Sequence, residues 1–290
     1  MMCRVSVLLP VLNGAATIEP AIRSILQQSF ADFELLVLDD GSTDDTQAIV
    51  QNLGDARVRW ISDGRRLRVG ARLNTGIDVA RAPYIARMDA DDLSFPERFE
   101  RQVAYLDQHS GIDVVSSRAL SFRQADLLPV GLTPSLLTHE QVTARPWSGI
   151  YVAHAAWMAR ASWYGRYRYR SPEVKRAEDQ ELLLRALPDS RYHCLPEVLY
   201  AIRREPFRFA KNFEARRSML QMQVRTFIAR RQWFNLGAAI AATAVKTGSD
   251  AMAAFPGKDG SRFMRKAEAV DAETHDRFSR LLAATGVVTA

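Results

Sequence analysis

Two aspartates one residue apart stand near the middle of the chain, in the sequence DADD at positions 89–92. Residues 84–88 before them are typical of a short strand, and a helix pattern begins near Pro96. Carboxylates in this arrangement can point the same way and bind one hard cation, and Mg²⁺ and Mn²⁺ prefer such oxygen ligands. The spacing therefore predicts a divalent-metal site, and the alternative is a solvated acidic turn.

A second acidic pair, Glu178 and Asp179, opens a predicted helix that runs to Ala186. Acidic residues are also favoured in the first turn of any helix, because they complement the helix dipole. The residues alone leave two interpretations open. The pair is either an ordinary helix start or a place where a carboxylate takes up a proton during a reaction.

Asp39 and Asp40 end another predicted strand. A carboxylate there can accept a hydrogen bond from the N3–H of uracil or thymine, and it selects these bases because an unmatched buried acceptor costs about 1–3 kcal/mol. We take Asp40 as the candidate for this role; the alternative is that both aspartates only start the next turn. The next segment holds guanidinium groups that suit a diphosphate, on Arg57, Arg59, Arg65, Arg66, Arg68 and Arg72.

These side chains depend on the elements around them, and the first 120 residues alternate strand and helix patterns. The predicted strands are residues 5–9, 35–38, 58–61, 84–88 and 113–116. Strands separated by helices predict a mostly parallel sheet with both faces covered. Such sheets bind ligands at the carboxyl ends of their strands. We therefore expect Pro10, Asn13, Asp40, Asp89 and Asp91 at one edge of the sheet.

The second half of the chain has a less regular pattern. Residues 121–150 are punctuated by proline and glycine, which predicts loops and a boundary. Residues 155–158 and 194–202 resemble strands, and from Pro206 onward apolar residues recur at helical spacing. The sequence therefore predicts an α/β domain followed by a helical appendage.

The predicted domain covers residues 1–205, with halves at 1–120 and 121–205, and the predicted C-terminal helical region covers 206–290. The helical region is rich in arginine and has an alanine-rich stretch. Such helices can lie on an anionic membrane face, and the alternative is a plain packed appendage.

The amino-acid composition limits the classes of protein to which the chain can belong. The chain has 290 residues and a net charge of +6, with the apolar and charged fractions of an ordinary globular protein. The positive charge suits nucleic acid, an anionic membrane or phosphate-bearing small molecules. Cys3 and Cys194 make no disulfide framework, which indicates a reducing compartment. Pro10 and Asn13 cut the N-terminal apolar run short, so we expect a buried strand instead of a signal peptide, and a cytoplasmic protein.

Three segments, residues 5–14, 33–44 and 88–92, together resemble the family 2 glycosyltransferases. The resemblance covers roughly residues 4–205, in order and with similar spacing. It implies a GT-A (Rossmann-like) fold, with a mostly parallel sheet flanked by helices. The first half would bind a nucleotide-sugar donor, for which a UDP-sugar is the expectation, and the second half would face the acceptor.

The resemblance also implies roles for the donor-side residues. The base would lie against Pro10, Leu12 and Asp40, with Asn13 in the same nucleotide-binding set and Arg68 the arginine nearest the nucleotide. Mn²⁺ or Mg²⁺ would serve as the cofactor, with Asp91 as its ligand. Asp89 would face the ribose and could also reach the metal through water.

On the acceptor side the resemblance implies that Asp179 is the general base, with Glu178 and His154 lining the acceptor. A single displacement inverts the anomeric carbon and needs no covalent carboxylate nucleophile. Many relatives carry Arg-x-His where this chain has Arg203 followed by arginine and glutamate. Arg203 would still contact the diphosphate, but fewer protein groups would hold the metal.

The sequence thus predicts an inverting, metal-dependent glycosyltransferase that acts on a polysaccharide, lipopolysaccharide or lipid-linked glycan, with possible peripheral contact with the inner face of the cell membrane. One alternative is a non-catalytic sugar-nucleotide-binding protein or scaffold. Another is a nucleotidyltransferase, which should have a glycine-rich phosphate loop after its first strand. Interleaved arginine and tyrosine at 166–170 could bind nucleic acid, but no nucleic-acid motif accompanies them and we expect an acceptor-side loop.

Overall fold

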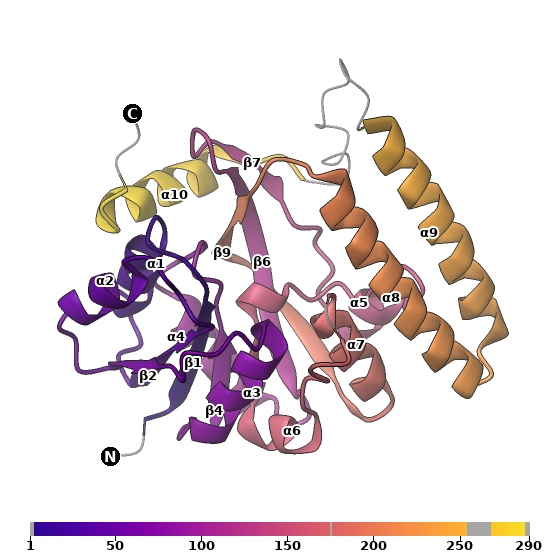
Figure 1. The fold of residues 1–290 in the computed structure, drawn as a ribbon, viewed down its shortest axis with the longest axis horizontal. Coiled ribbons are helices and arrows are strands. Elements are labelled where there is room, and N and C mark those ends of the chain that lie inside the picture. Colours follow the sequence, from indigo (N-terminus) through magenta and orange to yellow (C-terminus); the bar gives the residue numbers. More distant parts are fainter. Residues whose placement is uncertain (1–2, 175, 254–267, 288–290) are drawn as a thin grey trace.

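The computed structural model describes residues 3–174, 176–253 and 268–287 (Figure 1). One curled sheet runs through the molecule in the order β3-β2-β1-β4-β8-β6-β9-β5, and β7 pairs with β6. The strands are β1 Val5–Val11, β2 Phe33–Asp39, β3 Val58–Ile61, β4 Tyr84–Arg87, β5 Leu93–Ser94, β6 Val114–Arg123, β7 Pro129–Leu132, β8 Met158–Arg160 and β9 Tyr192–Arg204.

Helices flank this sheet. They are α1 Ile18–Leu26, α2 Thr46–Asn52, α3 Val69–Val79, α4 Arg98–Gln108, α5 His139–Thr143, α6 Ala161–Arg166, α7 Glu178–Ala186, α8 Phe209–Ala229, α9 Trp233–Ala253 and α10 Ala272–Ala284. The predicted mixed α/β architecture with a C-terminal helical part is confirmed. The longest ladders, β1 with β2 and β6 with β9, are parallel.

The first half of the sheet is buried on both faces. Val7 and Leu9 of β1 point into a core shared with α1 and α4, whereas Leu8 points into the opposite core with α3. A Cβ on Gly76 of α3 would lie 2.6 Å from a methyl group of Leu38, so α3 approaches the sheet more closely than any larger residue allows. The continuous apolar runs of β1 and β2 follow from this double burial.

In the second half of the domain the observed elements differ from three predictions. β6 continues to Arg123 and β7 occupies residues 129–132, both inside the segment predicted as loops. Residues 154–156 form a single 3₁₀ turn, and β8 starts only at Met158, so the predicted strand over 155–158 is wrong. Ala155 and Ala156 are buried within this turn without being extended, because burial alone does not select a strand.

The C-terminal helices lie in two places. The α8–α9 hairpin stands at one end of the molecule, whereas α10 lies at the other, near α1 (Figure 1). Phe278, Leu281 and Leu282 of α10 pack into a third core with β5 and β6. No helix among the described residues is both long and apolar enough to cross a membrane. The division into residues 1–205 and 206–290 stays a prediction.

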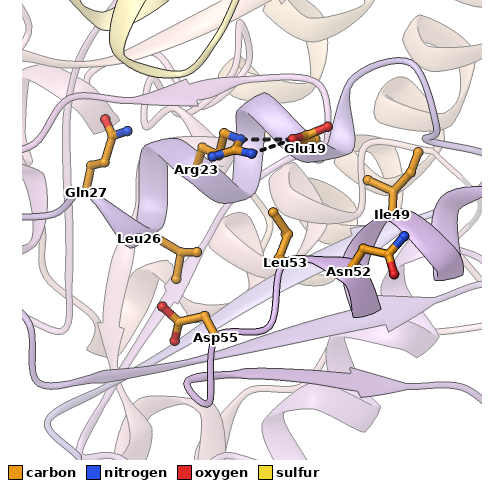
Figure 2. Close-up of a pocket in the computed structure, with 8 residues that line it drawn as sticks. All are labelled: Glu19, Arg23, Leu26, Gln27, Ile49, Asn52, Leu53 and Asp55. Atoms are coloured by element: carbon orange, nitrogen blue, oxygen red, sulfur yellow. Dashed lines mark hydrogen bonds and ion pairs between the residues drawn. The ribbon is translucent and has the colours of Figure 1, made fainter.

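A groove of about 420 Å³ lies between α1 and α2. Arg23 donates hydrogen bonds of 3.0 and 2.7 Å to Glu19 beside this groove (Figure 2). None of the predicted site residues lines this groove. The predicted site residues lie instead at the carboxyl ends of the strands, where such sheets bind ligands.

Candidate active site

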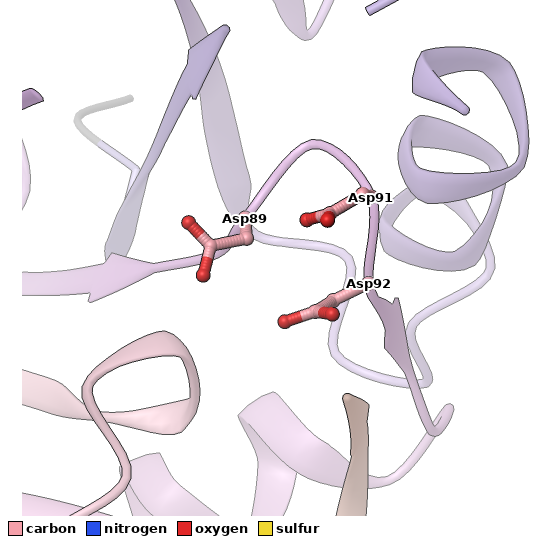
Figure 3. Close-up of side chains that lie close together, drawn as sticks. All are labelled: Asp89, Asp91 and Asp92. Atoms are coloured by element: carbon pink, nitrogen blue, oxygen red, sulfur yellow. The ribbon is translucent and has the colours of Figure 1, made fainter. Parts of the chain in front are cut away.

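The acidic loop after β4 gathers three carboxylates. Asp89, Asp91 and Asp92 each offer one oxygen, and these oxygens lie within 4.8 Å of one another (Figure 3). The backbone N–H of Met88 donates to the carbonyl of Leu8 at 3.0 Å, which fixes the start of the loop beside the end of β1. The predicted clustering at the strand ends is therefore present.

The three acids differ in their partners. Arg87 donates two hydrogen bonds to Asp89, one of them 2.8 Å long. Buried Asp92 accepts from the backbone N–H of Arg203 at 2.7 Å, and the Tyr200 hydroxyl accepts from the backbone N–H of Asp89 at 3.2 Å. In the described part of the chain no side chain donates to the carboxylate of Asp91. Asp91 is thus the acid most open to an added ligand.

Mutual repulsion among the three carboxylates is a physical reason why this loop could hold a cation. Burial, and then the negative charge of Asp89, raises the pKa of Asp91. Burial and the charges of both other aspartates raise the pKa of Asp92 well above its usual value. A bound cation would relieve this repulsion, and a set of carboxylate oxygens suits Mg²⁺ or Mn²⁺. The residues therefore fit the predicted metal.

Arg87 is a site residue that sequence reasoning missed. Its side chain is buried, with the residue only 5% exposed, and its Nε has no hydrogen-bond partner in the described structure. Burial opposes its charge, but the nearby carboxylates, Asp89 first and also Glu178, raise its pKa overall. The one available signal was an arginine inside an otherwise apolar strand, which needs a buried anionic partner.

Glu178 and Asp179 begin α7 at the predicted position. Ala177 before them has the left-handed backbone angles φ 58° and ψ 37°, which are costly for a residue with a Cβ. Burial, and then the charge of Asp179, raises the pKa of Glu178, to which Asp89 also contributes. Burial likewise raises the pKa of Asp179. The two acidic pairs, far apart in sequence, therefore share one electrostatic environment around Arg87.

His154 lies in the same environment. Its Nε2 is 2.8 Å from the hydroxyl of Tyr169, and its ring meets Trp157 edge to face. Burial, and then the charge of Arg87, lowers its pKa well below the usual value, which favours the neutral ring. Asn74 of α3 holds the backbone of Tyr169 by hydrogen bonds of 2.9 and 3.1 Å. His154 is therefore fixed within the fold beside the acidic residues.

Asp40 organises the loop before α3. It accepts from the backbone N–H groups of Leu67 and Arg68 at 2.7 and 3.0 Å, and from Nε of Arg72 at 3.1 Å. Arg72 is buried, whereas the side chain of Arg68 is exposed and precedes the helix. The two arginines therefore do not share a helix face, and sequence reasoning missed Arg72 as the partner of Asp40.

The loops after β1 and β2 are tied together. Asn13, in the left-handed conformation with φ 52°, accepts from the N–H of Thr43 at 2.9 Å, and its own N–H donates to Ser42 at 2.9 Å. Pro10 pairs in register with residue 38 at the end of β1, and Leu12 is half-buried beyond it. These contacts hold the predicted nucleotide-binding residues of the two loops next to each other.

Arg203 supports the acidic loop from β9. Its Nε donates to the backbone carbonyl of Asp91 at 2.7 Å, and its guanidinium lies over the ring of Phe122. Glu205, where the expected histidine would stand, forms an exposed ion pair of 2.7 Å with Lys211. The acidic loop thus gains an arginine from β9 but no imidazole at that position.

The arginines of the 166–170 run are engaged within the protein. Arg166 pairs with Asp113 at 2.6 Å, Arg168 with Asp78 at 2.7 Å and Arg170 with Glu181 at 3.4 Å. Tyr169 of the same run is buried. Because the arginines already neutralise protein carboxylates, they offer little net charge to a nucleic acid.

Comparison with known sequences gives one family. The sequence model described as "Glycosyl transferase family 2" matches residues 6–168. The chain is 35% identical over 219 residues to the putative glycosyltransferase EpsE of Bacillus subtilis, covering 72% of this chain and 76% of EpsE. It is 32% identical over 102 residues to the Escherichia coli protein named UDP-Glc:alpha-D-GlcNAc-diphosphoundecaprenol beta-1,3-glucosyltransferase WfgD, covering 35% of this chain and 40% of WfgD.

Comparison with solved structures agrees on the fold. Residues 1–349 of TarS from S. aureus, in complex with UDP-GlcNAc, match with a TM-score of 0.64 at 17% identity, over 97% of this chain and 80% of that one. The mannosyltransferase PcManGT from Pyrobaculum calidifontis, in complex with GDP-Man and Mn²⁺, matches with a TM-score of 0.61 at 17% identity, over 99% and 87%. At this identity the likeness shows a shared fold.

Proposed function

Because the chain belongs to glycosyltransferase family 2 and has the GT-A fold, we propose that it transfers a sugar from a UDP-sugar to an acceptor hydroxyl with inversion. One observation carries this proposal. The carboxylates of Asp89 and Asp91, predicted for the donor, and those of Glu178 and Asp179, predicted for the acceptor, all interact electrostatically with buried Arg87. A transferase needs both groups of acids at one place, because donor and acceptor react there.

The donor nucleotide is assigned to the loops after β1 and β2. Among the described residues, Oδ2 of Asp40 accepts one hydrogen bond, from the Arg68 N–H at 3.1 Å, and so can accept another from the N3–H of uracil. Pro10, Leu12 and Asn13 would line the base beside it. The exposed guanidinium of Arg68 and that of Arg203 would meet the diphosphate, for which bidentate arginine contacts are well suited.

Asp91, with Asp89 directly or through water, would hold Mn²⁺ or Mg²⁺ at the diphosphate. Such an ion neutralises charge on the departing nucleoside diphosphate. Arg87 would orient the carboxylate of Asp89 toward the ribose. Since no histidine follows Arg203, phosphate oxygens or water would complete the metal shell.

Asp179 would act as the general base. Its oxygen takes the proton of the acceptor hydroxyl while that hydroxyl attacks the anomeric carbon from the face opposite the nucleotide. Burial raises its pKa, which makes it a stronger base than an exposed aspartate. Glu178 and neutral His154 would orient the acceptor. One displacement inverts the anomeric centre, and no residue has to form a glycosyl-enzyme bond.

Thermal-shift measurements with UDP, UDP-sugars and GDP-mannose, with and without Mn²⁺, test this proposal. We expect stabilisation by a UDP-sugar that depends on the metal, since a ligand that binds only the folded state raises its stability by mass action. Asp91→Ala should abolish the metal dependence, and exposed Asp276→Ala on α10 is the matched control. If no nucleotide stabilises the protein with any metal, the proposed function fails.

A sugar-nucleotide-binding protein without turnover is the second candidate, favoured by the absence of the histidine after Arg203. Such a protein would show the same thermal shifts. Release of UDP in the presence of an acceptor mixture, lost in Asp179→Asn, distinguishes the enzyme from the binder.

The acceptor is proposed to be a hydroxyl of a polysaccharide, lipopolysaccharide or lipid-linked glycan, on the inner face of the cell membrane. WfgD, whose name includes a diphosphoundecaprenol-linked sugar, supports a lipid-linked acceptor. The basic C-terminal helices would then make peripheral contact with the membrane.

A further inference from the structure

Helix α9 carries its charged side chains inward and its large apolar side chains outward. Lys246 donates to the backbone carbonyl of Ser148 at 3.0 Å, and Asp250, only 2% exposed, pairs with Arg216 of α8. Meanwhile Phe234 is 80% exposed and Val245 is 73% exposed. A surface helix of a globular protein shows the opposite arrangement. The outer face of α9 is therefore suited to contact an apolar surface.

The apolar face extends along the whole helix. Trp233, Phe234, Ile240, Val245 and Met252 are its large exposed residues, and the exposed positions between them are glycine, alanine and one serine. A helix of this length is about 30 Å long. Figure 1 shows α9 at the outer edge of the molecule, with α8 between it and the sheet.

The hairpin that presents this face is strongly basic. Residues 206–253 contain eight lysines or arginines and two acidic residues, an excess equal to the net charge of +6 of the whole chain. Arg217 and Arg225 of α8 and Arg231 of the turn before α9 are exposed. A hairpin that exposes both an apolar helix face and arginines suits an anionic lipid surface, in which acyl chains lie beneath charged headgroups.

We propose that the outer face of α9 docks on an anionic phospholipid bilayer, with α9 lying in the interface. A second copy of the chain fits less well, because a two-fold contact would bring two hairpins of charge +6 together. Since none of the described helices is suited to cross a membrane, the contact is peripheral.

The hairpin also reaches the acceptor side. Gln223 of α8 donates to the carbonyl of Pro146 at 2.9 Å, and Glu214 pairs at 3.4 Å with Arg176, two residues before Glu178. Docking through α9 would therefore bring the Glu178–Asp179 side of the site close to the membrane. This consequence rests on the proposed function, whereas the docking itself does not.

Co-sedimentation with vesicles of phosphatidylglycerol and phosphatidylcholine, compared with phosphatidylcholine alone, tests the proposal. We expect the wild-type protein to bind the anionic vesicles, with binding weakened by added salt. Phe234→Glu combined with Val245→Glu should reduce the binding constant at least tenfold, because it removes two large apolar contacts and adds repulsion. Leu128→Glu, at a residue 49% exposed and away from the hairpin, is the matched control and should bind normally.

Nucleotide-induced thermal shifts, measured without vesicles, separate this inference from the proposed function. The double variant should keep the wild-type shift with UDP-sugar and Mn²⁺, which also shows that it is folded. Three results overturn the inference: no binding of the wild type to anionic vesicles, equal binding by the double variant, or a wild-type dimer that the double variant dissociates. Vesicle binding without any nucleotide shift leaves the docking surface intact and overturns only the transferase proposal.

Discussion

At the scale of single residues, Arg87 explains how so many carboxylates coexist. It is buried between the acidic loop and the start of α7, and it binds Asp89 with both terminal nitrogens. Buried charges are tolerated when they are paired, and removal of one partner leaves the other uncompensated. The planar shape of the guanidinium matters as well as its charge, because lysine cannot form the bidentate hydrogen bonds that Arg87 forms with Asp89.

Arg87→Lys should therefore keep the protein folded but weaken donor binding. Losing one charge-assisted hydrogen bond is worth about 1.5–3 kcal/mol, so we expect the dissociation constant for UDP with Mn²⁺ to rise at least tenfold in calorimetric titrations. Exposed Arg101→Lys on α4 is the control and should bind as the wild type does. An unchanged dissociation constant in Arg87→Lys would show that the hold on Asp89 is not used in binding.

Asp179 links catalysis to pH. Because its folded pKa is raised above the ordinary value, the folded state holds this proton more tightly than the unfolded chain does. The contribution of this group to stability is therefore lost as pH rises through the folded pKa. At neutral pH the carboxylate is ionised at a cost, which asparagine removes while keeping an acceptor oxygen for Gln180.

Asp179→Asn should thus lower turnover by about 10²–10⁴-fold while raising the melting temperature at pH 7.5 by a few degrees. The gain in melting temperature should disappear at a pH below both pKa values. Thermal unfolding across pH measures this, with exposed Asp276→Asn as the control. A variant less stable than the wild type at pH 7.5 would contradict the argument.

At the scale of elements, sequence periodicity predicted strands β1 to β4 and the bounds of α7, because the strands are short apolar runs and the helix has an apolar stripe, but it missed the two-residue strand β5. It failed at β7, which starts at Pro129 and includes Gly131. Proline and glycine usually mark loops, yet β7 pairs with β6 on one side and has only one described bridge, from Leu132 to Glu268, on the other, and such an edge strand tolerates them.

The candidate site was predictable where it follows strand ends, and not where it depends on tertiary contacts. Asp40, Asp89 and Asp91 lie at the ends of parallel strands, so topology alone brings them together. The partners of Asp40 and Asp89, Arg72 and Arg87, could not be chosen from sequence among so many arginines. That choice depends on which guanidinium is buried next to which carboxylate.

At the scale of the whole molecule, the helices after residue 205 pack at two opposite ends of the α/β domain (Figure 1). The α8–α9 hairpin holds the excess positive charge and packs on the half predicted to face the acceptor, where it contacts Pro146. In contrast, α10 returns to the half predicted to bind the donor, where Gln27 just after α1 donates to the carbonyl of Ala284 at 2.7 Å. The last helix therefore closes the core behind the acidic loop.

Phe278→Ala tests this closure. Phe278 is 1% exposed, its ring centroid lies 5.0 Å from that of Phe122, and it shares a core with Leu93, which directly follows Asp92. Truncation of a buried phenylalanine costs about 3–5 kcal/mol, so the urea midpoint should fall sharply. Exposed Met252→Ala on α9 should change stability by less than about 0.5 kcal/mol.

The same variant should weaken the metal-dependent shift with UDP-sugar, although Phe278 touches no ligand. Leu93 and Phe95 anchor the acidic loop from behind, and a cavity beneath them would let the loop move. A urea midpoint equal to the wild type's would mean that α10 is not part of the folded core. A lower midpoint with an unchanged nucleotide shift would mean instead that Arg203 and Tyr200, which bond the loop from β9, suffice to hold its carboxylates in place.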